Sequence, residues 1–375
     1  MPVPVTDLLS TTLSSPVTFS LEPVYNTFNS LSLLTRADML SGLDDWVTRT
    51  LASLPAERLH QHELVFLGLY FAVEPTRSFP TFAAYIDDIA RQTPETLRDR
   101  VFEAYDRLGP CTEAQQMSAP TDMPSLLADR QVFIQYLKER FSPDHVIESI
   151  ETEAHALLND PIRMRNQIVE HLQSMWQTVL APEWARVTPM LQACVDAYQQ
   201  IDFSGQTPTQ VAESIVGHAL TDDWRQKLGT VDRLICVPSA HLGPYLMKYS
   251  QWRNVPANVP RTLTLLFGAR QPQGITATSP DLSRSELLVR LVALADDTRL
   301  RVLRLIAEQG EMCSPDIIRQ LDLSQSAASR HLQQLTATGY LEERRREGAK
   351  CYSLSADHVD DTFRALLRYL QSKRS

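Results

Sequence analysis

The segment from Ser314 to Leu354 constrains this chain most, because two short helical patterns in it are separated by a very tight turn. The first pattern, "SPDIIRQLDL", has Ser314 as a capping residue and a proline at the first helical position. Its core-facing residues are Ile317, Ile318 and Leu321. Ser324 then caps a second helix, "QSAASRHLQQLTATG". Two short helices joined this tightly are typical of a helix-turn-helix.

The second helix of this pair separates apolar from hydrogen-bonding residues. Its apolar stripe, which we expect to pack on the preceding helices, consists of Ala328, Leu332 and Leu335. A recognition helix needs small residues near its N-terminus and hydrogen-bonding side chains beyond them in order to reach base edges in a DNA groove. We therefore predict that DNA is contacted by Ser324, Gln325, Ser326, Ser329, Arg330, His331 and Gln334.

A basic hairpin is predicted directly after this helix. "YLEERRREGAKCYSLS" has the pattern of strand, tight turn and strand, with Gly348 at the tip. Its cations are Arg344, Arg345, Arg346 and Lys350. A basic run alone is more often a solvated surface, but after a helix-turn-helix we interpret it as a wing that reaches phosphates or a minor groove.

Residues 285–370 resemble the ArsR-type winged-helix repressors. The motifs that carry the resemblance are "LADDTRLRVLRLI", "LSQSAASRHLQQLTATGYL" and "RRREGAKCYSL", in the order and at the spacing of that family. The resemblance implies four helices, a β-wing, a final helix at "DHVDDTFRALLRYLQ" and a symmetric dimer. It also implies sequence-specific binding to double-stranded operator DNA with an inverted repeat.

The metal chemistry of that family does not transfer to this chain. Its thiol site has two cysteines one residue apart, but "EMCSPD" has Cys313 and then Pro315 in the second position. In its other site, His358 matches one ligand, whereas Tyr369 and Ser372 replace a histidine and a glutamate. A single thiol or imidazole is too few ligands for tight coordination. We predict no metal site and no cofactor.

The cysteines are scattered and show no disulfide framework. Reduced thiols in a cytoplasm are the expected state of Cys111, Cys194, Cys236, Cys313 and Cys351. Oxidation sensing by Cys313 and Cys351 is an alternative, with Lys350 next to Cys351 as a cation that lowers its pKa. We favour the plainer interpretation that Cys351 is a small filler in a strand.

Charge is distributed unevenly along the chain. The net charge of −9 argues against nucleic-acid binding by the chain as a whole. Residues 283–375, however, have 15 Lys and Arg against 13 Asp and Glu, and the remaining residues have 21 against 32. The most apolar window, "ELVFLGLYFAV", is too short to span a bilayer, and the N-terminus lacks the pattern of a secretory signal. We expect a cytoplasmic protein with no membrane partner.

Periodicity predicts a mainly α fold with a small β portion. We assign residues 1–202 to a mainly helical regulatory domain and residues 203–270 to a small α/β portion packed on it. The strands of that portion are expected at "RLICVPSAHL" and "TLTLLFGA". A linker rich in Pro, Gly, Ser and Thr follows at 271–284, and the winged helix-turn-helix domain occupies 285–375.

The first 280 residues contain no recognised catalytic motif. In "HQHE", His60 and His62 point in different directions on a helix and cannot chelate one ion together. His155 and His171 are expected at the surface. In layout, with "FSLEPVYNTFNSLSLL" and "MWQTVLAPEW", the region is similar to an uncharacterised extension of some long ArsR-type regulators. A small-molecule effector pocket, masking of the DNA-binding surface and enlargement of the dimer interface all stay open as its role.

Three functional classes follow from these observations. We favour a dimeric, DNA-binding transcription regulator that acts as a repressor and is not an enzyme. One alternative is an enzyme that uses the winged helix for docking or dimerisation. The other is a protein-interaction module, because winged helices also bind proteins. Turnover in a hydrolase and transferase screen, or an absence of duplex binding at low salt, would distinguish them.

Overall fold

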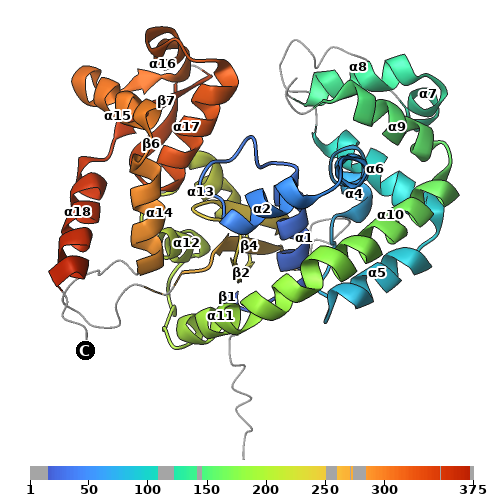
Figure 1. Ribbon diagram of the computed structural model, residues 1–375, viewed down its shortest axis with the longest axis horizontal. Coiled ribbons are helices and arrows are strands. Elements are labelled where there is room, and N and C mark those ends of the chain that lie inside the picture. Colours follow the sequence, from blue (N-terminus) through green and yellow to red (C-terminus); the bar gives the residue numbers. More distant parts are fainter. Residues whose placement is uncertain are drawn as a thin grey trace, which may run out of the picture.

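The computed structural model describes residues 16–108, 122–141, 146–250, 260–270, 272, 284–346 and 348–371. In Figure 1, a helical lobe lies on one side of a central sheet, and the C-terminal domain, coloured orange to red, lies on the other side. The mainly α fold with small sheets is therefore confirmed. We call residues 16–270 the module and residues 284–371 the winged-helix domain.

The helical lobe is built from short amphipathic helices around one apolar core. Several of them begin at a side-chain cap, including Asp44, Thr81 and Asp160, each of which accepts a backbone N–H of the first turn. Among the described residues, no helix is long and apolar enough to cross a membrane. The helices are α1 (Pro23–Leu34), α2 (Asp45–Ser53), α3 (Ala56–Glu63), α4 (Tyr70–Val73), α5 (Phe82–Arg91), α6 (Pro94–Leu108), α7 (Met123–Ala128), α8 (Arg130–Arg140), α9 (Glu148–Leu158) and α10 (Pro161–Met175), with π-helical turns at Leu64–Gly68 and Trp176–Leu180.

The central sheet has the strand order β1-β2-β4-β3. Its strands are β1 (Val17–Phe19), β2 (Arg233–Ser239), β3 (Leu246–Ser250) and β4 (Thr262–Gly268). The two predicted strands, β2 and β4, do pair, and they are parallel. β1 was not predicted from the sequence; it extends the parallel part, while β3 is antiparallel to β4. Alternate residues enter opposite cores, as Leu265 does on one side and Leu266 on the other.

Three further helices cover the second face of the sheet. They are α11 (Ala181–Gln199), α12 (Pro208–Val216) and α13 (Asp222–Leu228). Thr207 and Gln210 form a capping box at the start of α12, and Gly217, with a positive φ, ends it. Aromatic rings fill this core, with Phe19 stacked on Tyr198 at a centroid distance of 4.7 Å. The sheet therefore separates two helical layers.

The winged-helix domain contains the predicted elements in the predicted order. They are α14 (Arg284–Leu294), α15 (Asp297–Gln309), β5 (Met312–Cys313), α16 (Ser314–Leu321), α17 (Gln325–Ala337), β6 (Leu341–Arg346), β7 (Ala349–Leu354) and α18 (Ala356–Gln371). The structure differs from the sequence prediction in one detail: the N-cap of α16 is Cys313 and not Ser314. The apolar stripe of α17 is buried as expected.

The two parts of the chain are in direct contact. Glu286 of α14 forms a buried ion pair with Arg270 at 2.8 Å and a second with Arg290 at 3.1 Å. His218 Nε2 lies 3.1 Å from the carbonyl oxygen of Ala337, at the end of α17. Figure 1 shows α17 and β6 beside α13. The predicted linker at 271–284 lies almost wholly outside the described residues.

Candidate nucleic-acid interface

Local sequence fixes the turn between α16 and α17. Asp322 adopts a left-handed backbone with φ 52, which Asp tolerates better than most residues, and it ends α16. The Ser324 hydroxyl then accepts the N–H of Ala327 at 3.2 Å and starts α17. Ile317 from α16 and Leu335 from α17 are buried in the same core. These contacts hold α17 against the domain by one face.

The first turns of α17 are open to solvent. Ser324, Gln325, Ser326 and Ser329 are exposed, so four of the predicted DNA contacts share one accessible surface. Arg330 is half-buried, and its guanidinium lies 3.5 Å from the carbonyl oxygen of Asp38 in the module. Small hydroxyl side chains at a helix N-terminus permit close approach to a phosphate backbone or a base edge.

The structure places the other two predicted contacts of α17 in buried positions. Gln334 is 1% exposed and packs against Gly42 of the module. The Gln334 Nε2 atom is so near that a Cβ atom added at Gly42 would be only 2.6 Å from it. His331 is 7% exposed, with Nδ1 3.8 Å from an Asp296 carboxylate oxygen, and burial lowers the pKa of its ring. Contact between DNA and Gln334 therefore requires the module to move, and the prediction that Gln334 and His331 bind DNA stays untested.

The wing presents its cations on a two-stranded ribbon. β6 and β7 are antiparallel, with Arg345 opposite Lys350, and Gly348 at the tip has φ 82, which glycine adopts without strain. Arg344, Arg345, Arg346 and Lys350 are all exposed. Lys350 pairs with Glu343 at 3.0 Å, and Arg345 pairs with Asp223 of the module at 3.3 Å. One of the four cations is thus engaged by the module.

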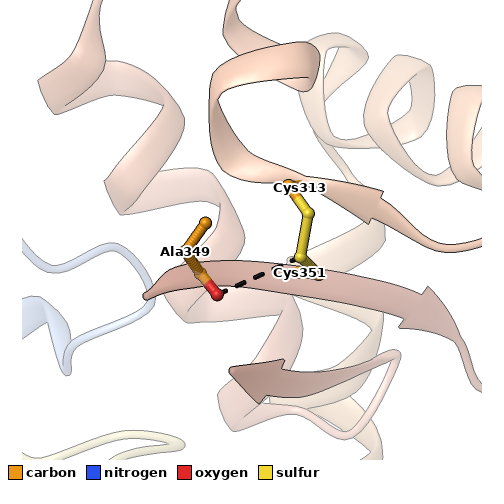
Figure 2. Close-up of a disulfide and its surroundings, with 3 residues drawn as sticks. All are labelled: Cys313, Ala349 and Cys351. Atoms are coloured by element: carbon orange, nitrogen blue, oxygen red, sulfur yellow. Dashed lines mark hydrogen bonds between the residues drawn. A yellow bond between two sulfur atoms is a disulfide. The ribbon is translucent and has the colours of Figure 1, made fainter. Parts of the chain in front are cut away.

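The cysteines near the wing correct the expectation of reduced, unpaired thiols. Cys313 at the end of β5 and Cys351 in β7 face each other in an antiparallel register and form a disulfide (Figure 2). The bond ties the start of α16 to the wing. Cys194 and Cys236 are free and buried, as thiols whose pKa is raised by burial. Cys111 lies outside the described residues.

Within the described ranges, no group of three or more His, Cys, Asp or Glu is arranged to hold a metal ion. The His358 ring lies beside that of His218, with centroids 5.8 Å apart. Burial, with further contributions from Arg290 and His218, lowers the pKa of His358 to about 4. The Tyr369 side chain is exposed on α18, and Ser372 lies outside the described residues.

The expectation that His155 and His171 are surface residues is wrong, because both are buried. His62 Nε2 donates to the carbonyl of Leu31 at 2.9 Å, so its Nδ1 accepts from His171 Nε2 at 3.0 Å. Burial lowers the pKa of His62 to about 4 and that of His171 to about 3. Two neutral rings therefore form a polar bridge inside the helical lobe.

A buried polar network in the module had no signal in the sequence. Ser30 Oγ lies 2.8 Å from His241 Nδ1, and His241 Nε2 lies 2.8 Å from Glu183 Oε1. Although burial opposes ionisation, hydrogen bonds from His241 and Arg186 lower the pKa of Glu183 to about 2. The order of the three side chains, Ser30, His241 and Glu183, resembles the nucleophile, base and carboxylate of a catalytic triad. The adjoining cavity is only about 10 Å³, however, so no substrate has access to them. In this conformation the network joins α1, α11 and the loop after β2.

A helix-turn-helix followed by a two-stranded wing defines the winged-helix class of domain. A profile described as "Bacterial regulatory protein, arsR family" matches residues 296–343. The chain belongs to this family through its C-terminal domain.

Curated relatives match the same part of the chain. The arsenic resistance transcriptional regulator ArsR1 of Pseudomonas putida is 51% identical over 53 residues, which are 14% of this chain and 41% of that protein. The arsenical resistance operon repressor of Escherichia coli is 44% identical over 62 residues, 16% of this chain and 53% of that protein. The chain thus spans less than two thirds of either relative. An uncharacterized HTH-type transcriptional regulator of Methanocaldococcus jannaschii is 36% identical over 69 residues, 18% of this chain and 78% of that protein.

Proposed function

We propose that this protein is a cytoplasmic, homodimeric repressor that binds operator DNA through its winged-helix domain and is regulated by its module. The observation that carries the proposal is the exposed N-terminal half of α17 next to a basic wing on the same domain. A helix of this kind enters a major groove with its first turns, while a wing contacts the backbone. The proposal extends the family membership of one domain to the whole chain.

Several of the predicted contacts have roles that fit their chemistry. The exposed residues Gln325 and Ser329 have hydrogen-bonding groups for base edges or phosphates. Arg330 provides a bidentate donor of the kind that reads guanine. The wing arginines are exposed cations for phosphates, with no base-specific role.

An exposed apolar surface supports the dimer. α14 and α18 pack against each other, and both still expose large apolar side chains. These are Leu288, Val292, Phe363, Leu367 and Leu370, of which Leu370 is 70% exposed. A contiguous apolar surface of this kind is unfavourable in water and typical of a protein interface. A second copy of the same pair of helices would cover it, and a two-fold axis would then present two copies of α17 to an inverted repeat.

The contacts of the module support a regulatory role by masking. Residues 38–42 lie against Arg330 and Gln334, and Asp223 holds a wing arginine. In this docked form the C-terminal half of α17 is not free to enter a groove. We infer that the docked form binds DNA weakly and that release of the module permits tight binding.

Two experiments with the full-length protein test this function. The operator is first selected from randomised duplexes, and affinity for the selected operator is then measured by fluorescence anisotropy. Arg330→Ala is expected to lose about 1–3 kcal/mol on the operator and much less on random DNA. Arg346→Ala should weaken binding to both duplexes alike and lower the salt slope by about one unit per wing.

Arg77→Ala, in an exposed ion pair of the helical lobe, is the matched control and should change neither duplex affinity. Equal losses on operator and random DNA for Arg330→Ala would remove that residue as a base reader. Failure to shift any duplex at low salt would favour a protein-interaction module over a DNA-binding regulator.

A further inference from the structure

A cavity of about 430 Å³ lies where the module meets the winged-helix domain. α13 and β3 of the module form one wall, which includes Trp224, Lys227 and Lys248. α17 and the wing form the other, which includes Gln333, Thr336, Leu341 and Glu343. Its volume lies within the range of small-molecule sites in proteins, roughly 300–1,000 Å³. A ligand that fills the cavity would contact both parts of the protein.

Two lysines in the module wall form an unusual pair. Lys227 of α13 and Lys248 of β3 both line the cavity, and the charge of Lys227 acts on Lys248. Burial, together with the Lys227 charge, lowers the pKa of Lys248 to about 7. Neither ammonium forms an ion pair with a carboxylate of the described residues. Two ammonium groups that line one cavity repel each other, and an anion bound between them would offset that repulsion.

Apart from Asp222, an exposed carboxylate in the first turn of α13, the other charged side chains described in the cavity lining are paired. Arg225 pairs with Glu213 at 2.9 Å, and Lys350 pairs with Glu343 at 3.0 Å. Asp223, the carboxylate that attracts Lys248 across the wall, pairs with Arg345. The unmet positive charge is thus concentrated at Lys227 and Lys248.

An aromatic ring lies next to this positive charge. Trp224 is partly buried against the sheet core, and the Lys248 ammonium is 5.7 Å from the centre of its ring. Trp224 lines the cavity and so offers an aromatic contact beside the two lysines. Such a combination recognises a small molecule with a planar ring and a negative group.

We propose that this cavity binds a small organic anion, a carboxylate or phosphate on a planar ring, with the anion between Lys227 and Lys248 and the ring on Trp224. The proposal rests on the regulatory role proposed above for the module. Because the ligand contacts both walls, it binds the docked form better than the released form. It therefore stabilises docking and lowers operator affinity, as an inducer of a repressor does.

Calorimetric titration of the full-length protein with 2-naphthoate tests the site without DNA. We expect saturable binding, and binding at least roughly tenfold weaker for the uncharged 2-naphthalenemethanol, because the alcohol lacks charge-assisted hydrogen bonds. The double substitution Lys227→Met with Lys248→Met should weaken naphthoate binding by roughly tenfold or more. Trp224→Leu should weaken binding of both probes.

Lys138→Met, in an exposed ion pair of the helical lobe, is the control and should leave binding unchanged. Equal affinity for the acid and the alcohol, or undiminished binding by the double lysine variant, would overturn the assignment. So would an absence of saturable binding by 2-naphthoate, benzoate and phenyl phosphate at millimolar concentration.

Operator binding with and without 2-naphthoate then tests the coupling separately. We expect 2-naphthoate to weaken operator binding severalfold in the parent protein and not in the lysine variant. Ligand binding without any duplex binding would leave the site standing and contradict the proposed repressor. Tighter operator binding in the presence of ligand would overturn the coupling.

Discussion

Loosening the contact between the module and the winged-helix domain should raise operator affinity. The double substitution His218→Ala with Asp223→Ala removes the contact to the Ala337 carbonyl and the ion pair to Arg345. Neither replaced residue belongs to the predicted DNA-binding surface. The change therefore acts on docking and leaves the proposed DNA contacts in place.

The size of the effect follows from the two interactions. A hydrogen bond of this kind contributes about 1 kcal/mol net, and an exposed ion pair contributes about 0.5 kcal/mol. Apparent affinity is reduced by the fraction of protein that is competent to bind. When the docked form predominates, weakening it by about 1.5 kcal/mol therefore raises operator affinity about tenfold.

Fluorescence anisotropy with the labelled operator measures this change, and circular dichroism verifies that the variant is folded. His60→Ala with Asp232→Ala is the matched control, because it breaks a histidine–glutamate pair and an aspartate–arginine pair inside the module. Unchanged or weaker operator binding by a folded His218/Asp223 variant would refute masking by the module. A similar rise in the control would refute the assignment of the effect to docking.

Three further results are expected. The disulfide between Cys313 and Cys351 closes a loop with a sequence separation of 38, so chain entropy predicts a stabilisation of about 4 kcal/mol; a thermal melt of the winged-helix domain that does not shift with a phosphine reductant would contradict this. His62 and His171 have folded pKa values below the unfolded value, so the unfolded state binds more protons below about pH 6.5 and stability falls as pH drops toward 4. Urea unfolding should lose roughly 2 kcal/mol per ring between pH 7 and 5, and less in a His171→Gln variant. Leu367→Glu places a charge on the exposed apolar surface of α18 and should convert the dimer to a monomer in sedimentation velocity, whereas an unchanged dimer would place the interface elsewhere.

The winged helix was predictable because its signals are local. Caps, a tight turn and a repeat of apolar residues such as Ala328, Leu332 and Leu335 specify each element within a few neighbouring residues. The parallel pairing of β2 and β4 was only partly predictable. Their continuous apolar composition indicates burial, but the direction and register of a parallel pair are set by the helices packed on its two faces. The short strand β1 has too few residues to give a pattern.

Pairs of distant residues left no signal that sequence reasoning detects. Cys313 meets Cys351 only because β5 and β7 align in one register, and the His62–His171 bridge depends on how the helices of the lobe pack. The burial of His155 and His171 was missed for the same reason. A helical wheel gives the direction of a side chain on its own helix and not what covers it.

Local hydrogen bonds and periodic burial can be recognised in the amino-acid sequence, and they were enough to predict a winged helix with a hydroxyl-rich second helix and a basic wing. How much of that surface is accessible depends on tertiary contacts that the sequence does not reveal. A wheel places Gln334 at one side of the helix and His331 near the border of the apolar face; the module covers Gln334, and both residues are buried. The cavity beside Lys227 and Lys248 likewise exists only because α13 and β3 meet α17 and the wing. Contacts between segments so far apart depend on the packing free energy of the whole fold, which no local stretch of sequence contains.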